Sequence, residues 1–320
     1  MANTWASARD RRVESEARIL VGAGHGARPD FCVEYGTQAE KIILTTAIFF
    51  GLISAITWGA GDFSGGMAVK RSNPCGVVIS AHAISLVSLS VLALILREPI
   101  PPLRDCLWGI AAGLCGGMGL ALLYTALASG QMSVAAPVSA LVAAMLPVLV
   151  GVYFAGLPGW PTFIGFALAL AAVWLISGGA GAKLHLRVLR LPLIAGVCFG
   201  LFFIFLHNGT GMSILWPTAA TRIVSIISLL TFSAVTHQRW IPMRESLLPV
   251  LGSAVLDTAG NVFYAMSARY GRMDVAAVLG SLYPGSTVFL AWMILKEKIS
   301  ISQWVGIAIA LVAIVMISIY

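Results

Sequence analysis

Charged residues are scarce in this chain. Only 10% of its 320 residues are Asp, Glu, Lys or Arg, whereas 59% are hydrophobic and the mean hydropathy is +0.92. Soluble domains carry roughly 25% charged residues, so a bilayer is the expected solvent for most of the chain. The sequence also lacks the G-x-x-x-x-G-K-[ST] loop that cradles nucleotide phosphates, which argues against a pump driven by nucleotide hydrolysis.

Clusters of metal-binding or catalytic side chains are missing as well. The five cysteines show no C-x-x-C or other metal-ligand spacing and are interpreted as small residues of membrane helices plus one thiol in the N-terminal tail. His82 and His207 fall near the ends of predicted helices, where a solvated or capping histidine is usual. We therefore expect no catalytic residues, no metal and no cofactor, and a membrane enzyme is disfavoured.

The net charge of +7 has a topological interpretation. The basic residues form short clusters between apolar runs, which is typical of membrane topology signals and not of nucleic-acid binding. The expected partners are a small-molecule substrate and the lipid bilayer of an inner or plasma membrane. The sequence leaves open the side on which the termini lie and whether the protein forms a homodimer.

The first 43 residues differ from the rest. Residues 1–41 hold several arginines and six of the 13 acidic side chains, with no apolar period, so this basic tail is predicted to be disordered. A further hypothesis is that translation starts later, near Val33 or Ile42.

From Leu44 onward the sequence predicts an all-α integral membrane protein. About ten apolar runs follow, each near the 20 residues that a helix needs to cross a bilayer. A basic connecting loop, residues 180–190, separates five runs in residues 44–179 from five in residues 191–320. An odd number of crossings per half makes the halves enter the membrane from opposite faces, which predicts two inverted five-helix repeats.

An internal self-match supports the two repeats. When Gly130 is set against Gly271, the ordered pattern G-x-M-x-V-A-A occurs in both copies and the similarity continues to the end of each half. Tyr124 and Tyr264 head the two copies if one residue is inserted. A self-match at a large fixed offset is a signal of fold, and in an apolar chain it points to two half-bundles, as in many transporters.

Asp257 is the strongest candidate for a functional charge. It falls in the middle of the eighth predicted helix, where a carboxylate costs at least ~2.5 kcal/mol and is expected to face the interior with a partner. Asn261 and Tyr264 follow at helical spacing on the same face, and Arg222 on the seventh helix is the expected counter-charge. The alternatives are a structural ion pair and a carboxyl group that couples transport to protons.

The first predicted helix contributes two further candidates. Trp58 is large and flat, so we expect it to line a cavity, although tryptophans are also common at membrane interfaces. Asp62 lies one turn further on. It either reaches the same cavity or stays at the interface facing Lys70 and Arg71, and the sequence slightly favours the interface.

Prolines and glycines mark special backbone. Pro137 and Pro147 are predicted to interrupt the fourth helix and Pro284 the ninth, and broken segments in two halves point to a binding site. Neutral polar groups near them are Tyr124, Ser139, Ser281 and Tyr283. Gly109, Gly113 and Gly117 recur every four residues on the third helix and predict a face where another backbone approaches closely.

These motifs resemble the EamA family of the drug/metabolite transporter superfamily. The features that carry the resemblance are five plus five short helices, Trp58-Gly59, the G-x-M-x-V-A-A entries into the fourth and ninth helices, and Lys296–Ser300 before Gln303–Gly306. It covers about residues 44–320. The first half departs from the family pattern at Gly156-Leu157-Pro158. A glutamate often closes the fourth helix of family members at this place, and Glu297 stands at the matching place in the second half.

The resemblance implies a function. Members are baskets of ten helices that move metabolites, such as amino acids, through a central cavity by alternating access. For this chain it implies a secondary transporter, most simply an exporter. The residues that we expect to line its cavity, from their own chemistry and positions, are Trp58, Tyr124, Asn261, Tyr264, Ser281, Tyr283 and Pro284. The alternatives are a passive channel-like bundle and, less favoured, a membrane enzyme.

Overall fold

The computed structural model describes residues 29–128, 132–176, 186–296 and 300–318, and all regular secondary structure in this part of the chain is helical, without strands. The helices of the first half are α2 (Pro29–Val69), α3 (Pro74–Ile95), α4 (Leu103–Ala128), α5 (Met132–Ala155) and α6 (Trp160–Ile176). Those of the second half are α7 (Leu186–Gly209), α8 (Leu215–Val235), the 3-10 turn η2 (Arg244–Ser246), α9 (Leu247–Tyr270), α10 (Met273–Gly280), α11 (Tyr283–Leu295) and α12 (Ile301–Ser318).

The lengths and compositions of these helices match a lipid bilayer. Within the described residues, seven segments are long and apolar enough to cross a membrane, one of them formed by α10 and α11 together. Parts of α5, α6 and α12 are shorter apolar helices. The prediction of an all-α protein with many membrane-spanning helices is thereby confirmed at this coarser level.

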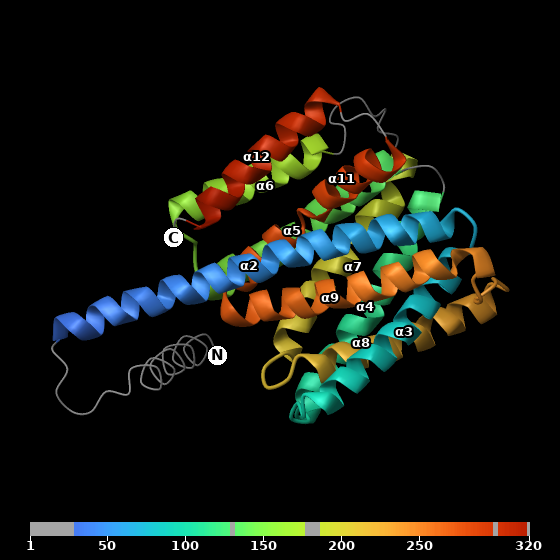
Figure 1. Ribbon diagram of the computed structural model, residues 1–320, viewed down its shortest axis with the longest axis horizontal. Helices are drawn as coiled ribbons and strands as arrows, with labels where there is room; N and C mark the ends of the chain where they lie inside the picture. The colour runs from blue at the N-terminus through green and yellow to red at the C-terminus, as the bar shows by residue number, and fades with distance from the viewer. Residues whose placement is uncertain (1–28, 129–131, 177–185, 297–299, 319–320) are drawn as a thin grey trace.

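The helices of the two halves pack reciprocally. Helix α2 packs along α9, and α7 packs along α4 in the same way (Figure 1). Helix α5 packs against α7, as α10 and α11 pack against α2. The remaining equivalent helices pair with each other, α3 with α8 and α6 with α12. Each half therefore completes the packing of the other.

The ends of α3 and α8 show that these two helices run antiparallel. Asn73, just before α3, donates to the Gln238 side chain after the end of α8, at 3.2 Å. Ser213, just before α8, donates to Glu98 after the end of α3, at 2.8 Å. The start of each helix thus lies beside the end of the other.

The same backbone turn ends both helices. Arg97 after α3 and His237 after α8 lie 140 residues apart, and both have positive φ, 50° and 51°. In each case the amide of the next residue donates to the carbonyl five residues earlier at 2.9 Å, from Glu98 to Ala93 and from Gln238 to Ser233. Positive φ is uncommon outside glycine, so its recurrence at this offset indicates one duplicated structure. Because the duplicated helices are antiparallel, the halves are inverted relative to each other.

Two predicted boundaries are wrong. Helix α2 begins at Pro29, so residues 29–43, predicted as disordered tail, are helical. Helix α7 begins at Leu186, inside the predicted connecting loop 180–190. The charged and polar residues of both segments predicted loops. A helix nevertheless extends beyond an apolar run where its backbone hydrogen bonds continue. The remaining tail, residues 1–28, and residues 177–185 of the connection lie outside the described residues.

The prolines act differently in the two halves. As predicted, the ninth apolar run is broken, with Ser281 and Leu282 between α10 and α11. The predicted interruption of the fourth run is wrong, because α5 is continuous through both of its prolines. Pro147 cannot donate to the Ala143 carbonyl, but a Cβ on Gly200 of α7 would lie 3.2 Å from that oxygen. Close packing covers the freed carbonyl without a break.

The glycines of α4 form the predicted close contact. A Cβ on Gly109 would meet the backbone of Pro217, one on Gly113 the backbone of Thr221, and one on Gly117 the side chain of Ser225. All three neighbours lie on α8. The small residues thus bring α4 and α8 together at backbone distance.

Candidate functional site

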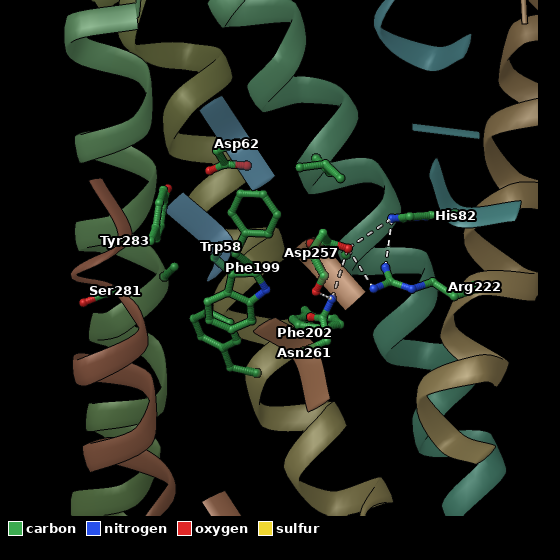
Figure 2. Close-up of a pocket in the computed structure, with 14 residues that line it drawn as sticks. Trp58, Asp62, His82, Phe199, Phe202, Arg222, Asp257, Asn261, Ser281 and Tyr283 are labelled. Carbon is green, nitrogen blue, oxygen red and sulfur yellow. Dashed lines mark hydrogen bonds and ion pairs between the residues drawn. The ribbon is translucent and has the colours of Figure 1, made fainter. Parts of the chain in front are cut away.

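A cavity lies between the two halves, at the depth of the membrane-spanning segments (Figure 2). Its volume is about 60 Å³, which is room for a few water molecules. The lining comes from α2, α3, α4 and α5 of the first half and α7, α8 and α9 of the second, with Ser281 at the break between α10 and α11 and Tyr283 at the start of α11.

A charged network forms one side of the cavity. Arg222 of α8 donates through Nη2 to Oδ2 of Asp257 of α9, at 2.8 Å. Its Nη1 lies 2.9 Å from Nε2 of His82 of α3. Arg222 and His82 are 4% and 2% exposed, so the guanidinium is removed from water and held by these two partners. The predicted pairing of Arg222 with Asp257 is what the structure shows.

The hydrogen bonds fix the proton of His82. A guanidinium group has donors only, so Nε2 of His82 accepts from Arg222. The proton therefore sits on Nδ1, which donates to Oγ of Ser225 at 2.7 Å. His82 is neutral in this arrangement, and its approach to Asp257 at 4.0 Å is not an ion pair.

His82 is also a correction to the sequence analysis. It lies inside α3, away from the helix end, and is buried rather than solvated or capping. The residue 140 positions further on is Arg222, so the two partners occupy equivalent places on α3 and α8. Extending the internal match to these helices would have placed them together.

Asp257 is the part of the network that faces the cavity. Its side chain keeps 20% exposure, against 5% for Arg222. Asn261, one turn along α9, donates to the Asp257 carbonyl at 2.7 Å and to its Oδ2 at 3.1 Å. One carboxylate oxygen thus collects the Arg222 and Asn261 donors. Within the described residues, Nε of Arg222 is buried without a hydrogen-bond partner.

Asp62 lies in the cavity wall. The sequence slightly favoured the interface, facing Lys70 and Arg71, but the structure places the carboxylate at the cavity, and Arg71 pairs with Glu245 at 3.3 Å. No hydrogen bond or ion pair to Asp62 is found among the described residues. Asp62 is partly exposed, so its carboxylate is open to whatever occupies the cavity.

Aromatic rings form the other side. Trp58 stacks on Phe203, with ring centroids 5.4 Å apart, and lies 5.6 Å from the ring of Tyr264. A Cβ on Gly260 or Gly280 would collide with the Trp58 ring, so these glycines make room for it. Trp58 is therefore a cavity residue held in place by packing and not an interfacial anchor. The other aromatic lining residues are Phe199, Phe202, Phe203 and Tyr283.

The phenylalanines of α7 were missed by the sequence analysis. Phe199 lies 141 positions after Trp58, the same offset as between Gly130 and Gly271. The structure supports this equivalence, because a Cβ on Gly119 would meet Phe199 as one on Gly260 would meet Trp58. The sequence match from Tyr124 and Tyr264 onward does not include the first helix of each half, and extending it to those helices would have found Phe199.

The remaining predicted residues fall into two groups. Ser281 and Tyr283 line the cavity, and the Tyr283 hydroxyl lies 3.2 Å from Oγ of Ser139. The buried residues Tyr124, Tyr264 and Pro284 are outside the lining. The Tyr124 hydroxyl bonds Ser253 at 3.1 Å, and that of Tyr264 donates to the Phe203 carbonyl at 3.1 Å. These tyrosines hold helices together behind the cavity.

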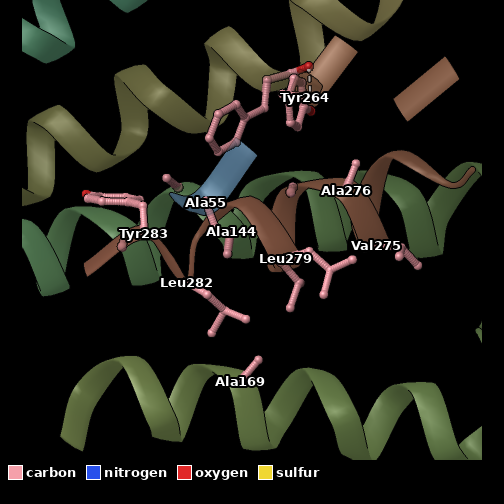
Figure 3. Packing of buried hydrophobic residues seen from close by; sticks show 14 of the residues in the cluster. Ala55, Ala144, Ala169, Tyr264, Val275, Ala276, Leu279, Leu282 and Tyr283 are labelled. Carbon is pink, nitrogen blue, oxygen red and sulfur yellow. Dashed lines mark hydrogen bonds between the residues drawn. The ribbon is translucent and has the colours of Figure 1, made fainter. Parts of the chain in front are cut away.

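Behind the cavity, small and branched side chains fill the core. Figure 3 shows the buried cluster around α10, which includes Ala144 of α5, Ala169 of α6 and Val275, Ala276 and Leu279 of α10. Alanines at such contacts allow helices to approach closely. The core therefore fixes the α10–α11 break, and with it Ser281 and Tyr283, against both halves.

The cavity combines equivalent positions with unequal chemistry. Asp257 of α9 approaches Gly61 of α2. The residues equivalent to these two, 141 positions away, are Gly116 of α4 and Phe202 of α7, and they also approach each other. Position 257 carries a carboxylate where position 116 carries no side chain. The arrangement of the duplicated helices is thus symmetric, whereas the carboxylate occurs in only one of the two halves.

Comparisons with known proteins agree with the duplicated frame. A family model described as the EamA-like transporter family matches residues 45–178 and again residues 188–319. An uncharacterized protein of Methanocaldococcus jannaschii is 26% identical over 129 residues, which make up 94% of that protein but 40% of this chain. The relative is therefore about as long as one of the two matched segments.

A solved crystal structure shows the same fold. It matches with a TM-score of 0.66 over 85% of this chain and 96% of its own, at 13% sequence identity. At this identity the likeness concerns the fold alone.

Proposed function

Because the chain belongs to the EamA-like transporter family, matched over both halves, we propose that it is a secondary transporter of small organic metabolites, such as amino acids. A solute would cross by alternating access through the cavity between the repeats, most simply in the direction of export. The resemblance read from the sequence is confirmed as membership of the family, and the chain is a multi-pass membrane protein. The solute class, the direction and the mechanism are our proposal.

The cavity is the observation that carries this proposal. It lies between two inverted halves, takes its lining from both of them, and holds charged groups at membrane depth. Intramembrane charges that face a cavity mark solute or ion pathways, and transporters with inverted repeats bind their solutes where the repeats meet. A rocking movement of one half against the other would open such a cavity to each side in turn.

We further propose ten membrane crossings. Seven long segments and three shorter apolar helices supply this number when α10 and α11 count as one crossing. Five crossings per half agree with the antiparallel run of α3 and α8. The most natural location is an inner or plasma membrane.

The Arg222–Asp257 pair is the proposed coupling element. A carboxylate paired with a buried arginine can exchange that partner for a proton during a transport cycle. If Asp257 couples uptake to protons, Asp257→Asn abolishes uptake driven by a pH gradient in proteoliposomes. Unchanged pH-driven uptake would remove Asp257 from the coupling mechanism.

Solute flux separates the candidate functions. Proteoliposomes containing the purified protein would be tested with each of the twenty labelled amino acids, after a thermal-shift screen against a metabolite library. A transporter shows uptake that saturates and is accelerated by unlabelled solute on the opposite side. Flux that neither saturates nor shows counterflow indicates a channel, and a chemically altered solute indicates an enzyme. Either outcome would contradict the proposal.

A further inference from the structure

The charges of the cavity do not balance. Asp257 is neutralised by Arg222 at 2.8 Å, and His82 is neutral because its Nε2 accepts from Arg222. Asp62 is the remaining ionisable acid in the lining, and within the described residues Arg222 is the only basic side chain there. The described lining therefore carries one carboxylate without a counter-charge.

An uncompensated carboxylate at membrane depth either takes up a proton or pairs with a positive charge. Burying an isolated charge is strongly unfavourable unless it is paired or hydrogen-bonded. The hydroxyl of Tyr124 contacts Ser253, and Arg71 pairs with Glu245. The open side of Asp62 faces the cavity, so a positively charged solute is the partner that this geometry admits.

The aromatic wall favours the same class of solute. In Figure 2, Trp58, Phe199 and Tyr283 lie on the side of the cavity where Asp62 projects, while Arg222 and His82 lie behind Asp257. The π faces of Trp, Tyr and Phe attract cations within about 6 Å of the ring centroid. An anionic solute would meet two carboxylates before it could reach the arginine.

We propose that the cavity selects small organic cations, namely amines or quaternary ammonium compounds with a compact apolar body, and that Asp62 is the residue that pairs with their charge. This inference rests on the proposed function and narrows it, because it favours amines over solutes with a free carboxylate. Asp257 and Arg222 remain a neutral pair beside the bound solute, and the aromatic rings contact its apolar part.

Three probes of similar size test this assignment. Purified protein would be titrated by calorimetry with 2-phenylethylammonium, with neutral 2-phenylethanol and with anionic phenylacetate. The cation should bind at least tenfold more tightly than either of the others. No binding of the cation, or equal or tighter binding of phenylacetate or 2-phenylethanol, would overturn the proposal.

Variants of Asp62 separate charge recognition from folding. Asp62→Asn should weaken cation binding at least tenfold, Asp62→Glu should retain most of it, and Glu245→Gln, which removes a surface carboxylate, should leave it unchanged. The thermal unfolding midpoint of Asp62→Asn should not fall, since no contact of the carboxylate is lost. Wild-type affinity in Asp62→Asn would show that the residue is not the cation partner.

Failure of this inference is distinguishable from failure of the proposed function. Counterflow of labelled 2-phenylethylammonium in proteoliposomes supports both. Binding without counterflow supports the site but contradicts transport of this cation. Counterflow of amino acids that are neutral overall or negatively charged, without cation binding, supports a transporter and overturns the assignment of Asp62.

Discussion

At the scale of single residues, Arg222 is the centre on which the site depends. From α8 it contacts Asp257 of α9 in the same half and His82 of α3 in the other half. Removing one member of a buried ion pair typically costs about 3–5 kcal/mol, because the other charge is left without a partner. Arg222 and its two partners therefore hold α3, α8 and α9 together and form one side of the cavity.

This contact predicts a measurable coupling. Asp257→Asn should lower the free energy of unfolding by about 3 kcal/mol, the lower end of that range, since 20% of the Asp257 side chain stays exposed. The double variant Arg222→Gln with Asp257→Asn should recover most of the loss. Unfolding of both proteins in detergent provides the comparison, and an equal or larger loss in the double variant would contradict the pairing.

Residue identity alone predicted part of this site. Asp257, Asn261 and Arg222 were found because charged or amide groups are expensive at membrane depth and must find partners. His82 was not identified, because a neutral histidine has no charge that must find a partner at membrane depth. Asp62 was placed at the interface because its depth depends on where the helix enters the bilayer, which an apolar run leaves uncertain by a turn or more.

At the scale of helices, packing by small residues decides the arrangement. Gly113 of α4 approaches the backbone of Thr221 on α8, leaving no room for a side chain. Gly113→Ala should destabilise the protein by roughly 1–3 kcal/mol, as overpacking usually does. Gly252→Ala is the matched control, since its Cβ meets only the Ser64 side chain, 3.2 Å away. Equal unfolding midpoints for the two variants would show that α4 and α8 are not held at backbone distance.

The break between α10 and α11 is the second feature of this scale. Pro284 cannot donate to the Gly280 carbonyl, and Ser281 lines the cavity beside this break. Pro284→Ala restores the donor and should favour a continuous helix. We expect slower solute flux with an unchanged unfolding midpoint, whereas Pro147→Ala in the continuous helix α5 should leave the flux near wild type. Wild-type flux in Pro284→Ala would contradict a role of the break in transport.

Sequence patterns predicted the helices better than their ends. Apolar runs located the membrane-spanning segments, since the bilayer imposes their length. Proline in α5 did not break the helix because neighbouring helices cover the freed carbonyl, as Gly200 does for Ala143. The start of α2 at Pro29 was missed because hydropathy reports the membrane and not helix formation outside it.

At the scale of the whole molecule, duplication explains most of the architecture. Equivalent turns at Arg97 and His237 and the reciprocal packing of the helices repeat one five-helix plan. The relative of about one repeat in length is consistent with this plan. The self-match in the sequence predicted this plan, because the two halves keep similar residues where close backbone packing limits the size of the side chains. The chemistry of the cavity could not be predicted in this way, since its charged residues are not repeated.

The most direct test of the account is the sidedness of equivalent loops. Single cysteines would replace Arg71, Arg97, Gly211 or His237 in a cysteine-free variant, and a membrane-impermeant maleimide would label intact and permeabilised cells. Inverted halves predict that positions 71 and 237 are labelled from one side of the membrane and positions 97 and 211 from the other. Labelling of positions 71 and 211 from the same side would mean parallel halves and would contradict the shared central pathway.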